Sequence, residues 1–351
     1  MRIYFVANAR MPSQKAYGIH IAKMCEALIE AGHELSLVVP SRAGGGPLKD
    51  FYGLRVEVPL VRVRSVVFER YERLGFFLMG LSFMLSSLAF LGGRKLAGEK
   101  FLIYTVDMDT FSHALLPLAG PVVAEFHSPK RPTFLARFFF KRARVVATNP
   151  LIAAELEKTF GLRGIPVEPN GVDESFFSLS ISSGRRAVYV GRFYAWKGLE
   201  ILPEAARLAP DVEFRVVGGS REEFKKVFGS AEDLQFADVP YAKVKDELAQ
   251  AGVLLLTGTA KNQDSNRYTA PMKVFEYLAT GKPVVASRTE ALASLIPEAL
   301  VRYCPPDDAA ALAAAVQEAL VHPGDRDARI AFAREHTWRA RAQRIAALFT
   351  R

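Results

Sequence analysis

The sequence predicts an α/β fold of two domains, each a parallel sheet with helices on both faces. The chain has 351 residues, which is too long for one ordinary core and long enough for two. Half of its residues are hydrophobic and 24% are charged, a composition typical of globular proteins. Short apolar runs alternate with helical patterns from end to end, and this alternation is typical of parallel sheets wound by helices.

The first half of the chain begins with a predicted buried strand and an amphipathic helix. The helix is expected at about Gly18–Ala31 and ends at Gly32. Its apolar face consists of Ile21, Met24, Cys25 and Leu28. The strands of this half are expected at Ile3–Ala7, Leu35–Val39, Val56–Val58, Phe101–Tyr104, Val122–Glu125 and Val145–Thr148.

The second half repeats the pattern after a segment without a strong helical period, Pro166–Ser183. This segment contains the turn signal Pro169-Asn170-Gly171, so we place the hinge between the domains there. The domains are therefore expected at 1–165 and 166–335, and a C-terminal helix at about 336–351 is expected to pack back on the first. The strands of the second domain are expected at Ala187–Val190, Glu213–Val217, Leu234–Phe236, Val253–Leu256, Pro283–Ala286 and Val301–Tyr303.

The chain start and the cysteines bear on the cellular compartment. The opening residues MRIYFVANAR predict a strand from residue 2, and they lack the basic, apolar and small-residue regions of a signal peptide. Cys25 and Cys304 are expected on an apolar helical face and near a strand end, so neither a disulfide framework nor a cysteine metal site is expected. A reducing cytoplasm is the expected location.

The net charge of +9 is concentrated in the first domain. Residues 1–165 contain 22 Lys and Arg against 13 Asp and Glu, and the remaining 24 and 24 cancel. This asymmetry predicts that the first domain faces something anionic. No nucleic-acid reading motif or aromatic RNP-like segment accompanies the charge, so nucleic acid is not expected as a partner. A membrane surface or a phosphate-bearing acceptor is the favoured partner.

The segment Leu74–Leu91 carries no charge over 18 residues, the lower length limit of a membrane span. A strand and a helix of the same domain precede it, and further strands of the same sheet follow. A span would therefore split the domain, and none is expected. Two interpretations remain open: a largely buried helix, or a helix whose apolar face rests on a membrane.

The stretch Lys130–Arg144 combines six cations with several phenylalanines. One interpretation is a basic amphipathic helix that binds an anionic membrane or a lipid phosphate. The other is an ordinary helix of the fold, whose core side would consist of Phe134, Leu135, Phe138 and Phe139.

The most informative segment is Ala270–Ala286. Pro271 fits the first turn of a helix, which Gly281 ends before a strand. The free N–H groups at a helix start bind anions, and Lys273 lies in a first turn where the helix dipole disfavours a cation, so an anionic ligand is indicated. Glu276 lies about 7.5 Å beyond Pro271 along the axis, roughly the spacing between a diphosphate and the ribose of its nucleotide. A solvated helix with ordinary charges is the alternative.

A second segment, Val188–Leu199, contains a predicted buried strand that ends at Gly191. The short loop after it presents Arg192 and Lys197 before the start of a helix. Loops at the carboxyl ends of parallel strands are where open α/β sheets bind ligands. Two cations beside a helix start suit a diphosphate leaving group, although Arg and Lys are also common on surfaces.

Together these two segments strongly resemble family 4 glycosyltransferases of the GT-B fold. The resemblance rests on Gly191-Arg192 with Lys197-Gly198, and on the run Pro271-Met272-Lys273-Val274-Phe275-Glu276. Asn170-Gly171-Val172-Asp173 is similar to the family's N-G-V-D turn, and Ser13–Gly18 with Ala31-Gly32-His33 also matches. The likeness runs from residue 1 to about residue 345, so it covers nearly the whole chain.

The resemblance implies two Rossmann-like domains that face each other across a cleft. It implies transfer of a hexosyl sugar from a nucleotide-diphosphate sugar in glycan biosynthesis, with retention of configuration, and with neither a metal ion nor a further cofactor. Members bind the nucleotide in the second domain and the acceptor mainly in the first. The charge excess of the first domain and its two apolar-rich segments, Leu74–Leu91 and Lys130–Arg144, further lead us to expect a lipid-linked or membrane-associated acceptor and a cytoplasmic enzyme that is peripheral on the inner face of the membrane.

Carried over residue by residue, the resemblance implies that Arg192 and Lys197 hold the donor diphosphate and act in catalysis. Glu276 is implied to hold the ribose, as the second acid of a Glu-x7-Glu motif whose first position is Tyr268 here. Asp264 could supply a carboxylate instead, or be a solvated loop residue. The implied donor-binding set also includes Gly18, Gly191, Pro271, Met272, Lys273 and Val274.

Two positions of the first domain complete the expected site. Gly18 would let the backbone approach the donor phosphates, since it has no Cβ; a plain helix start is the alternative. His127 follows a predicted strand, should point into the cleft, and resembles the family's His near the transferring sugar. Its implied role is hydrogen bonding and charge stabilisation near the anomeric carbon, and a structural His is the alternative.

The implied reaction needs no nucleophilic carboxylate. The acceptor hydroxyl attacks on the leaving-group face and a phosphate oxygen takes its proton, so the paired acids of glycoside hydrolases are not expected. Two other functions remain open. One is a nucleotide-sugar epimerase of the same fold, and the other is a catalytically inactive membrane-bound homologue, for which Tyr268 is the support.

Overall fold

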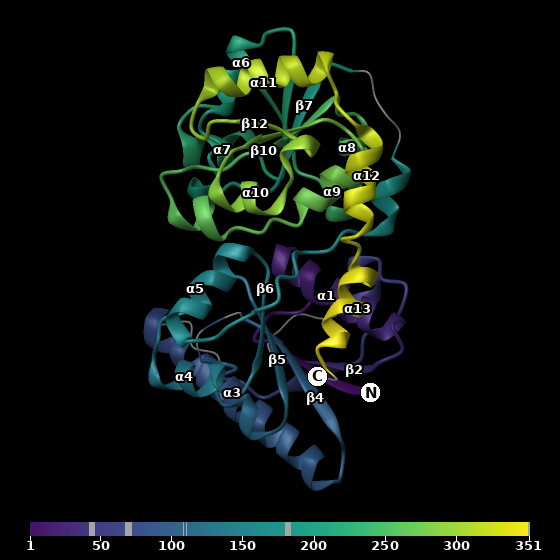
Figure 1. Cartoon of the computed structure of the whole chain (residues 1–351), viewed down its shortest axis with the longest axis vertical. Coiled ribbons are helices and arrows are strands. Elements are labelled where there is room, and N and C mark those ends of the chain that lie inside the picture. The colour runs from purple at the N-terminus through teal and green to yellow at the C-terminus, as the bar shows by residue number, and fades with distance from the viewer. Residues whose placement is uncertain (42–45, 67–71, 108, 110, 180–183, 350–351) are drawn as a thin grey trace. The chain divides into compact units, whose positions relative to one another are not determined.

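The computed structural model describes residues 1–41, 46–66, 72–107, 109, 111–179 and 184–349 (Figure 1). The chain divides into two compact units. Unit 1 consists of Met1–Thr148, Ile152–Glu168 and Trp338–Arg351, and unit 2 of Asn149–Leu151 and Pro169–Thr337. Among the described residues, each unit contains a six-stranded sheet whose strands pair in parallel. The predicted α/β fold of two Rossmann-like domains is confirmed.

The sheet of unit 1 has the strand order β3-β2-β1-β4-β5-β6. Its strands are β1 (Arg2–Val6), β2 (Glu34–Pro40), β3 (Leu60–Val63), β4 (Phe101–Val106), β5 (Val122–Phe126) and β6 (Arg144–Ala147). They are mostly apolar, because a parallel sheet is covered on both faces. In the register, Arg2 lies opposite Glu34 on one side and Phe101 on the other. The strand order reverses between β1 and β4, and ligands bind open sheets at such switch points.

One predicted strand of this sheet is wrong. Val56–Val58 is a loop, and β3 begins at Leu60 instead. Val58 is buried, so the apolar alternation reflects burial and not strand pairing. Pro59 has no N–H to donate to a ladder, so the strand starts only after it. The other predicted strands overlap observed ones.

Helices connect the strands of the first half. They are α1 (Ala16–Glu30), α2 (Leu48–Tyr52), α3 (Glu72–Leu96), the 3-10 turn η1 (Leu116–Leu118), α4 (Phe134–Phe140) and α5 (Pro150–Phe160). The apolar face predicted for the first helix is wholly buried in α1.

The last helix, α13 (Trp338–Ala347), belongs to unit 1 although unit 2 precedes it in the chain. It packs against α1. The Trp338 ring lies 5.3 Å from the ring of His20, and Arg341 Nη1 lies 3.2 Å from Met24 Sδ. The chain therefore returns to its first unit and places side chains of residues 338–349 beside those of the first helix.

The sheet of unit 2 has the order β12-β11-β10-β7-β8-β9, with a switch point between β7 and β10. Its strands are β7 (Arg186–Val190), β8 (Glu213–Val217), β9 (Leu234–Ala237), β10 (Val253–Leu256), β11 (Val284–Ser287) and β12 (Arg302–Cys304). Its helices are α6 (Leu202–Leu208), α7 (Arg221–Phe228), α8 (Val244–Ala249), α9 (Lys273–Ala279), α10 (Glu290–Leu295), α11 (Ala309–Val321) and α12 (Arg326–Arg334). The 3-10 turns are η2 (Glu174–Ser178), η3 (Ala195–Lys197), η4 (Tyr241–Lys243) and η6 (Glu298–Leu300), and η5 (Asp264–Tyr268) is a π-helical turn. Ser220, Thr289 and Asp308 cap the helices that follow them.

Helix α3 contains the uncharged segment and is long and apolar enough to cross a membrane by length and composition. One third of its apolar window is buried. The buried positions include Phe83, Ser87 and Leu91, which share one helical face. The exposed large apolar side chains of the helix are Leu74, Phe76, Phe77, Leu85 and Leu96. The helix is therefore a core helix on one face only, and the interpretation as a largely buried helix is wrong.

Helix α4 occupies only the middle of Lys130–Arg144. Thr133 caps it by accepting a hydrogen bond from the N–H of Ala136, and β6 begins at Arg144. Phe139 and Phe140 are buried, whereas Phe134 is 83% exposed. The expectation of a core position for Phe134 is therefore wrong. The buried face of the helix consists of Ala136 and the residues three and four positions after it, Phe139 and Phe140.

Candidate active site

The loop after β7 lies at the switch point of the second sheet. Gly191 directly follows β7 with a φ of +148°, a conformation that favours glycine, and its N–H donates to Val217 O at 2.8 Å. Lys197 Nζ turns back over this loop and donates to Arg192 O at 3.1 Å. It also lies 5.1 Å from the Tyr194 ring and 5.6 Å from the Trp196 ring. Burial lowers the pKa of Lys197 to about 8.

The lysine of helix α9 lies close to this loop. Lys273 Nζ donates to Val190 O at 3.4 Å and lies 3.7 Å from the centre of the Tyr189 ring. Burial and repulsion from Lys197 hold the pKa of Lys273 well below its usual range. The amino groups of Lys197 and Lys273 are thus brought together at the carboxyl end of β7. An anionic group between them would restore the charge of both.

Arg192 points from the same loop toward the end of β8. Its Nη1 donates to Gly218 O at 3.1 Å and lies 3.4 Å from Asp238 Oδ1. The pair with Asp238 is exposed, so it holds the guanidinium only weakly. The arginine remains available to an anion at this edge of the sheet.

Glu276 is on the same helix as Lys273 and is 7% exposed. Its Oε1 accepts a hydrogen bond from the Tyr241 hydroxyl at 2.8 Å. Burial raises the pKa of Glu276 to about 7, against the opposing effects of Tyr241 and Lys273. A carboxyl group of this kind can accept hydrogen bonds from the hydroxyls of a ligand. Tyr241 is a site residue that the sequence patterns do not reveal, because it comes from a separate turn after β9.

The residues just before α9 form an ordered segment. Tyr268 ends the π-helical turn η5 and is buried, with its hydroxyl 3.3 Å from Gln263 Nε2. Asp264, which begins that turn, is exposed. The helix starts at Lys273, so Pro271 and Met272 precede it, and Pro271 O accepts from the N–H of Val274. Val274 is fully buried and supports the helix from the core.

Gly18 lies in the first turn of α1, in unit 1. A Cβ at this position would lie 2.6 Å from both Ser13 O and the Tyr52 hydroxyl. The Tyr52 hydroxyl accepts from Ser13 N at 2.6 Å and donates to Ser13 O at 2.8 Å. The absence of a side chain at Gly18 therefore leaves room for the Tyr52 hydroxyl, which binds the backbone of the loop before α1. The role of Gly18 in donor binding stays a prediction.

His127 follows β5, as predicted. Its Nε2 lies 2.7 Å from Glu125 Oε1, and its backbone N–H donates to Asp107 Oδ1 at 2.9 Å. The imidazole is 31% exposed, so one side of it is accessible. Its ring lies 4.9 Å from that of His20, at an angle of 90°.

Glu125 is the buried centre of this group. Its Oε1 lies 3.1 Å from His20 Nε2, its Oε2 lies 2.7 Å from Arg341 Nη2, and the Tyr104 hydroxyl donates to the same Oε2. Burial acts to raise the pKa of Glu125, but Arg341 and the neighbouring imidazoles outweigh it and hold the pKa well below its usual range. Glu125, Tyr104 and Arg341 are absent from the sequence-based site.

His20, Glu125 and His127 also have the donor atoms of a metal site, and these atoms lie within 4.8 Å of one another. The guanidinium of Arg341 contacts the same carboxylate, and its permanent charge opposes a second cation there. The group fits a hydrogen-bonded network better than a metal centre. The predicted independence of metal ions stays a prediction.

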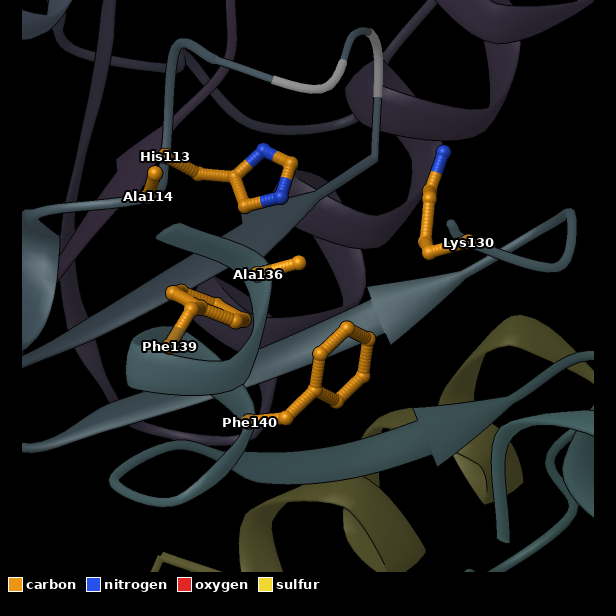
Figure 2. Close-up of a pocket in the computed structure, with 6 residues that line it drawn as sticks. All are labelled: His113, Ala114, Lys130, Ala136, Phe139 and Phe140. Atoms are coloured by element: carbon orange, nitrogen blue, oxygen red, sulfur yellow. The ribbon is translucent and has the colours of Figure 1, made fainter. Parts of the chain in front are cut away.

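A pocket in unit 1 lies next to the end of β5 (Figure 2). It is lined by His113, Ala114, Lys130, Ala136, Phe139 and Phe140. Burial lowers the pKa of His113 to about 4, so its imidazole is neutral. Lys130 Nζ lies 2.7 Å from Asp107 Oδ2, and the other oxygen of Asp107 accepts from the N–H of His127. The Asp107 carboxylate thus holds both Lys130, which lines the pocket, and the backbone of His127.

GT-B glycosyltransferases have two sheets with this Rossmann-like strand order. They also have basic side chains at the point where the strand order of the second sheet reverses. Residues 18–176 match the family model "Glycosyltransferase Family 4", and residues 184–322 match "Glycosyl transferases group 1". The chain is a glycosyltransferase of the GT-B type. It belongs to glycosyltransferase family 4.

Solved structures share the fold over the whole chain. The Anabaena protein HepE in complex with UDP is 18% identical, with a TM-score of 0.74 and coverage of 100% of both chains. The apo lipopolysaccharide outer core galactosyltransferase WaaB is 13% identical, with a TM-score of 0.68 and coverage of 100% of this chain and 99% of that one. UDP-GlcNAc 2-epimerase from Neisseria meningitidis is 13% identical, with a TM-score of 0.60 and full coverage of both. No curated protein matches the sequence.

Proposed function

We propose that the enzyme transfers a hexosyl group from a nucleoside-diphosphate sugar to an acceptor hydroxyl, with retention of configuration and without a metal ion. The observation that carries the proposal is the position of two lysines at the end of β7, where Lys197 Nζ donates to Arg192 O and Lys273 Nζ donates to Val190 O. Glu276 lies one helical turn beyond Lys273. A diphosphate between the two amino groups would favour the charged form of both lysines and offset their mutual repulsion. A carboxylate one turn further along suits the ribose hydroxyls.

In the proposed reaction, the acceptor oxygen bonds to the anomeric carbon while the bond from that carbon to the diphosphate oxygen breaks on the same face. The acceptor proton passes to the departing phosphate oxygen. Lys197, Lys273 and Arg192 stabilise the charge that develops on the diphosphate. His127 hydrogen-bonds close to the reacting carbon. No enzyme carboxylate forms a covalent bond to the sugar.

The structures of HepE hold UDP and UDP-glucose, which makes UDP the first nucleotide to test. Thermal unfolding with UDP, GDP and ADP tests the donor site, because a ligand at 100 times its Kd stabilises by about 2.7 kcal/mol. We expect one nucleotide to stabilise the enzyme and Lys197→Ala to abolish the effect. If none of the three stabilises it, the donor proposal is wrong. If the sugar of the donor is epimerised without an acceptor, the enzyme is an epimerase.

We further propose that the acceptor is lipid-linked or held at the membrane, and that unit 1 binds the cytoplasmic face of an anionic bilayer. The exposed apolar residues of α3 support this, since large exposed apolar patches mark interaction surfaces. So does the charge of +9 within residues 1–165. In α4 and just after it, exposed Phe134 is accompanied by the exposed cations Arg137, Lys141 and Arg142.

Sedimentation with anionic and with neutral liposomes tests membrane binding. Binding to anionic vesicles should fall as salt rises, because charges are screened within about 10 Å at 0.1 M salt. Reversing the charge of Lys141 and Arg142 should weaken it, since each cation contributes about 1 kcal/mol near an anionic surface. The matched control reverses Lys225 and Lys226, two exposed cations of unit 2. A protein that ignores anionic vesicles at low salt has no such surface.

A further inference from the structure

The buried group around Glu125 combines charge and hydrogen bonds in an otherwise apolar strand. Glu125 is fully buried, and both carboxylate oxygens are engaged. Oε1 faces the imidazoles of His127 and His20, and Oε2 faces Arg341 and the Tyr104 hydroxyl. A buried carboxylate is costly unless it is paired and hydrogen-bonded, and here it is both.

Arg341 determines the charge state of this group. It is fully buried, and its Nη2 also lies 3.1 Å from Glu168 O. An arginine does not lose its proton in a protein, so the charge beside Glu125 is permanent. The carboxylate is therefore ionised, and an ionised carboxylate only accepts hydrogen bonds. The nitrogen of His127 that contacts it must carry a proton.

We propose that Glu125 and Arg341 are positioning residues, which fix His127 in the tautomer with its proton on Nε2 and leave Nδ1 to accept a hydrogen bond from a substrate hydroxyl. This inference rests on the proposed role of His127 in sugar transfer. It also assigns a function to the C-terminal helix. Arg341 lies after all of unit 2 in the sequence, yet it orients a side chain at the end of β5.

Other charged groups near His127 act on its backbone or have fixed states. Asp107 accepts from the backbone N–H of His127 and pairs with Lys130. Burial lowers the pKa of His20, so this imidazole is neutral. Burial and the adjacent Glu125 hold the pKa of Tyr104 well above its usual range, so its hydroxyl is a donor. None of these groups replaces Glu125 as the acceptor of the imidazole proton.

The test is Glu125→Gln, read by nitrogen NMR of the histidine side chains. Arg341 will hold the amide oxygen, so the amide NH2 will face His127 and require an acceptor nitrogen there. We expect His127 to change from the Nε2–H to the Nδ1–H tautomer. The kcat should fall by about 10- to 100-fold, the loss found when the hydrogen-bond partner that orients a metal-bound histidine is removed. The Kd for the nucleotide should stay unchanged, because the donor cations belong to unit 2.

Two further variants separate positioning from stability. Glu125→Gln combined with Arg341→Met removes both charges, so it should fold even where Arg341→Met alone does not, because no buried charge is left unpaired. Its kcat should remain low. The matched control is Glu168→Gln with Arg344→Met, which removes the pair one turn further along α13, with Nε and Oε2 2.8 Å apart. It should keep both the tautomer and the kcat.

The outcomes distinguish this inference from the proposed function. If His127→Ala transfers sugar at the normal rate, the role of His127 is wrong. If His127→Ala is inactive but His127 keeps its Nε2–H tautomer in Glu125→Gln, the positioning role is overturned and the proposed function stands. An equal loss of kcat in the Glu168 and Arg344 control would also overturn it, because docking of α13 would then explain the effect.

Discussion

Raising the pH should weaken binding of the nucleotide, because Lys197 lies close to its titration point. Burial lowers the pKa of Lys197 to about 8 in the ligand-free enzyme. A bound diphosphate favours the charged form and raises this pKa. Well below pH 8 Lys197 is charged with and without ligand, so it adds no pH dependence to the affinity there. Above pH 8 the ligand must draw a proton onto the lysine, so the affinity falls.

The magnitude follows from the two pKa values. If the complex restores Lys197 to its ordinary pKa, the Kd rises about 22-fold between pH 7.5 and 9.5, or ~1.8 kcal/mol. Lys273 steepens the rise, because burial and Lys197 also lower its pKa. Burial raises the pKa of Glu276 to about 7, so protonation of this carboxyl affects nucleotide binding mainly at lower pH. The comparison therefore starts at pH 7.5.

Isothermal titration calorimetry in buffers of different ionisation enthalpy measures both the Kd and the protons taken up. At pH 9 we expect uptake approaching one proton for Lys197, with more if Lys273 contributes. Lys197→Arg keeps its charge at every pH used, so it should lose the contribution of this residue to the slope. The reasoning is refuted if the Kd of the unmodified enzyme is constant over this range. It is equally refuted if Lys197→Arg shows the same slope as the unmodified enzyme.

Three further outcomes are expected of the same site. Lys197→Ala and Arg192→Ala should each lower turnover by about a hundredfold or more in a transfer assay, and normal rates in both would remove them from the leaving-group site. Glu276→Gln should weaken nucleotide binding by about 1.5–3 kcal/mol in calorimetry, because a charge-assisted hydrogen bond is lost; an unchanged Kd would contradict the ribose contact. Transfer should persist in EDTA, and a loss that added divalent cations restore would show that the reaction uses a metal.

Most of the fold is readable from the sequence because the strands are buried on both faces. Continuous apolar runs such as Val253–Leu256 leave few alternatives to a central strand. Val56–Val58 shows the limit of this reading, since a loop residue such as Val58 is buried as well. Helix bounds are less certain. The helix expected to include Pro271 begins at Lys273, because backbone conformation before the helix depends on contacts outside the segment.

The donor site is readable where its residues share one segment. Lys197 belongs to a short loop, and Lys273 and Glu276 belong to one helix, so their spacing in sequence is close to their spacing in the structure. Tyr241 is not readable in this way. Its hydroxyl reaches Glu276 from another turn, and only the packing of the sheet brings the two together.

Glu125 is an intermediate case, because its sequence context predicts that it has a partner but not which one. It lies in Val122–Phe126, a strand whose other residues are all apolar, and an unpaired carboxylate in such a strand would be unstable. A buried carboxylate therefore implies a buried cation. The nearest cation in the sequence, Lys130, pairs with Asp107 instead. The cation must then come from a distant segment, and in the structure it is Arg341 of the C-terminal helix.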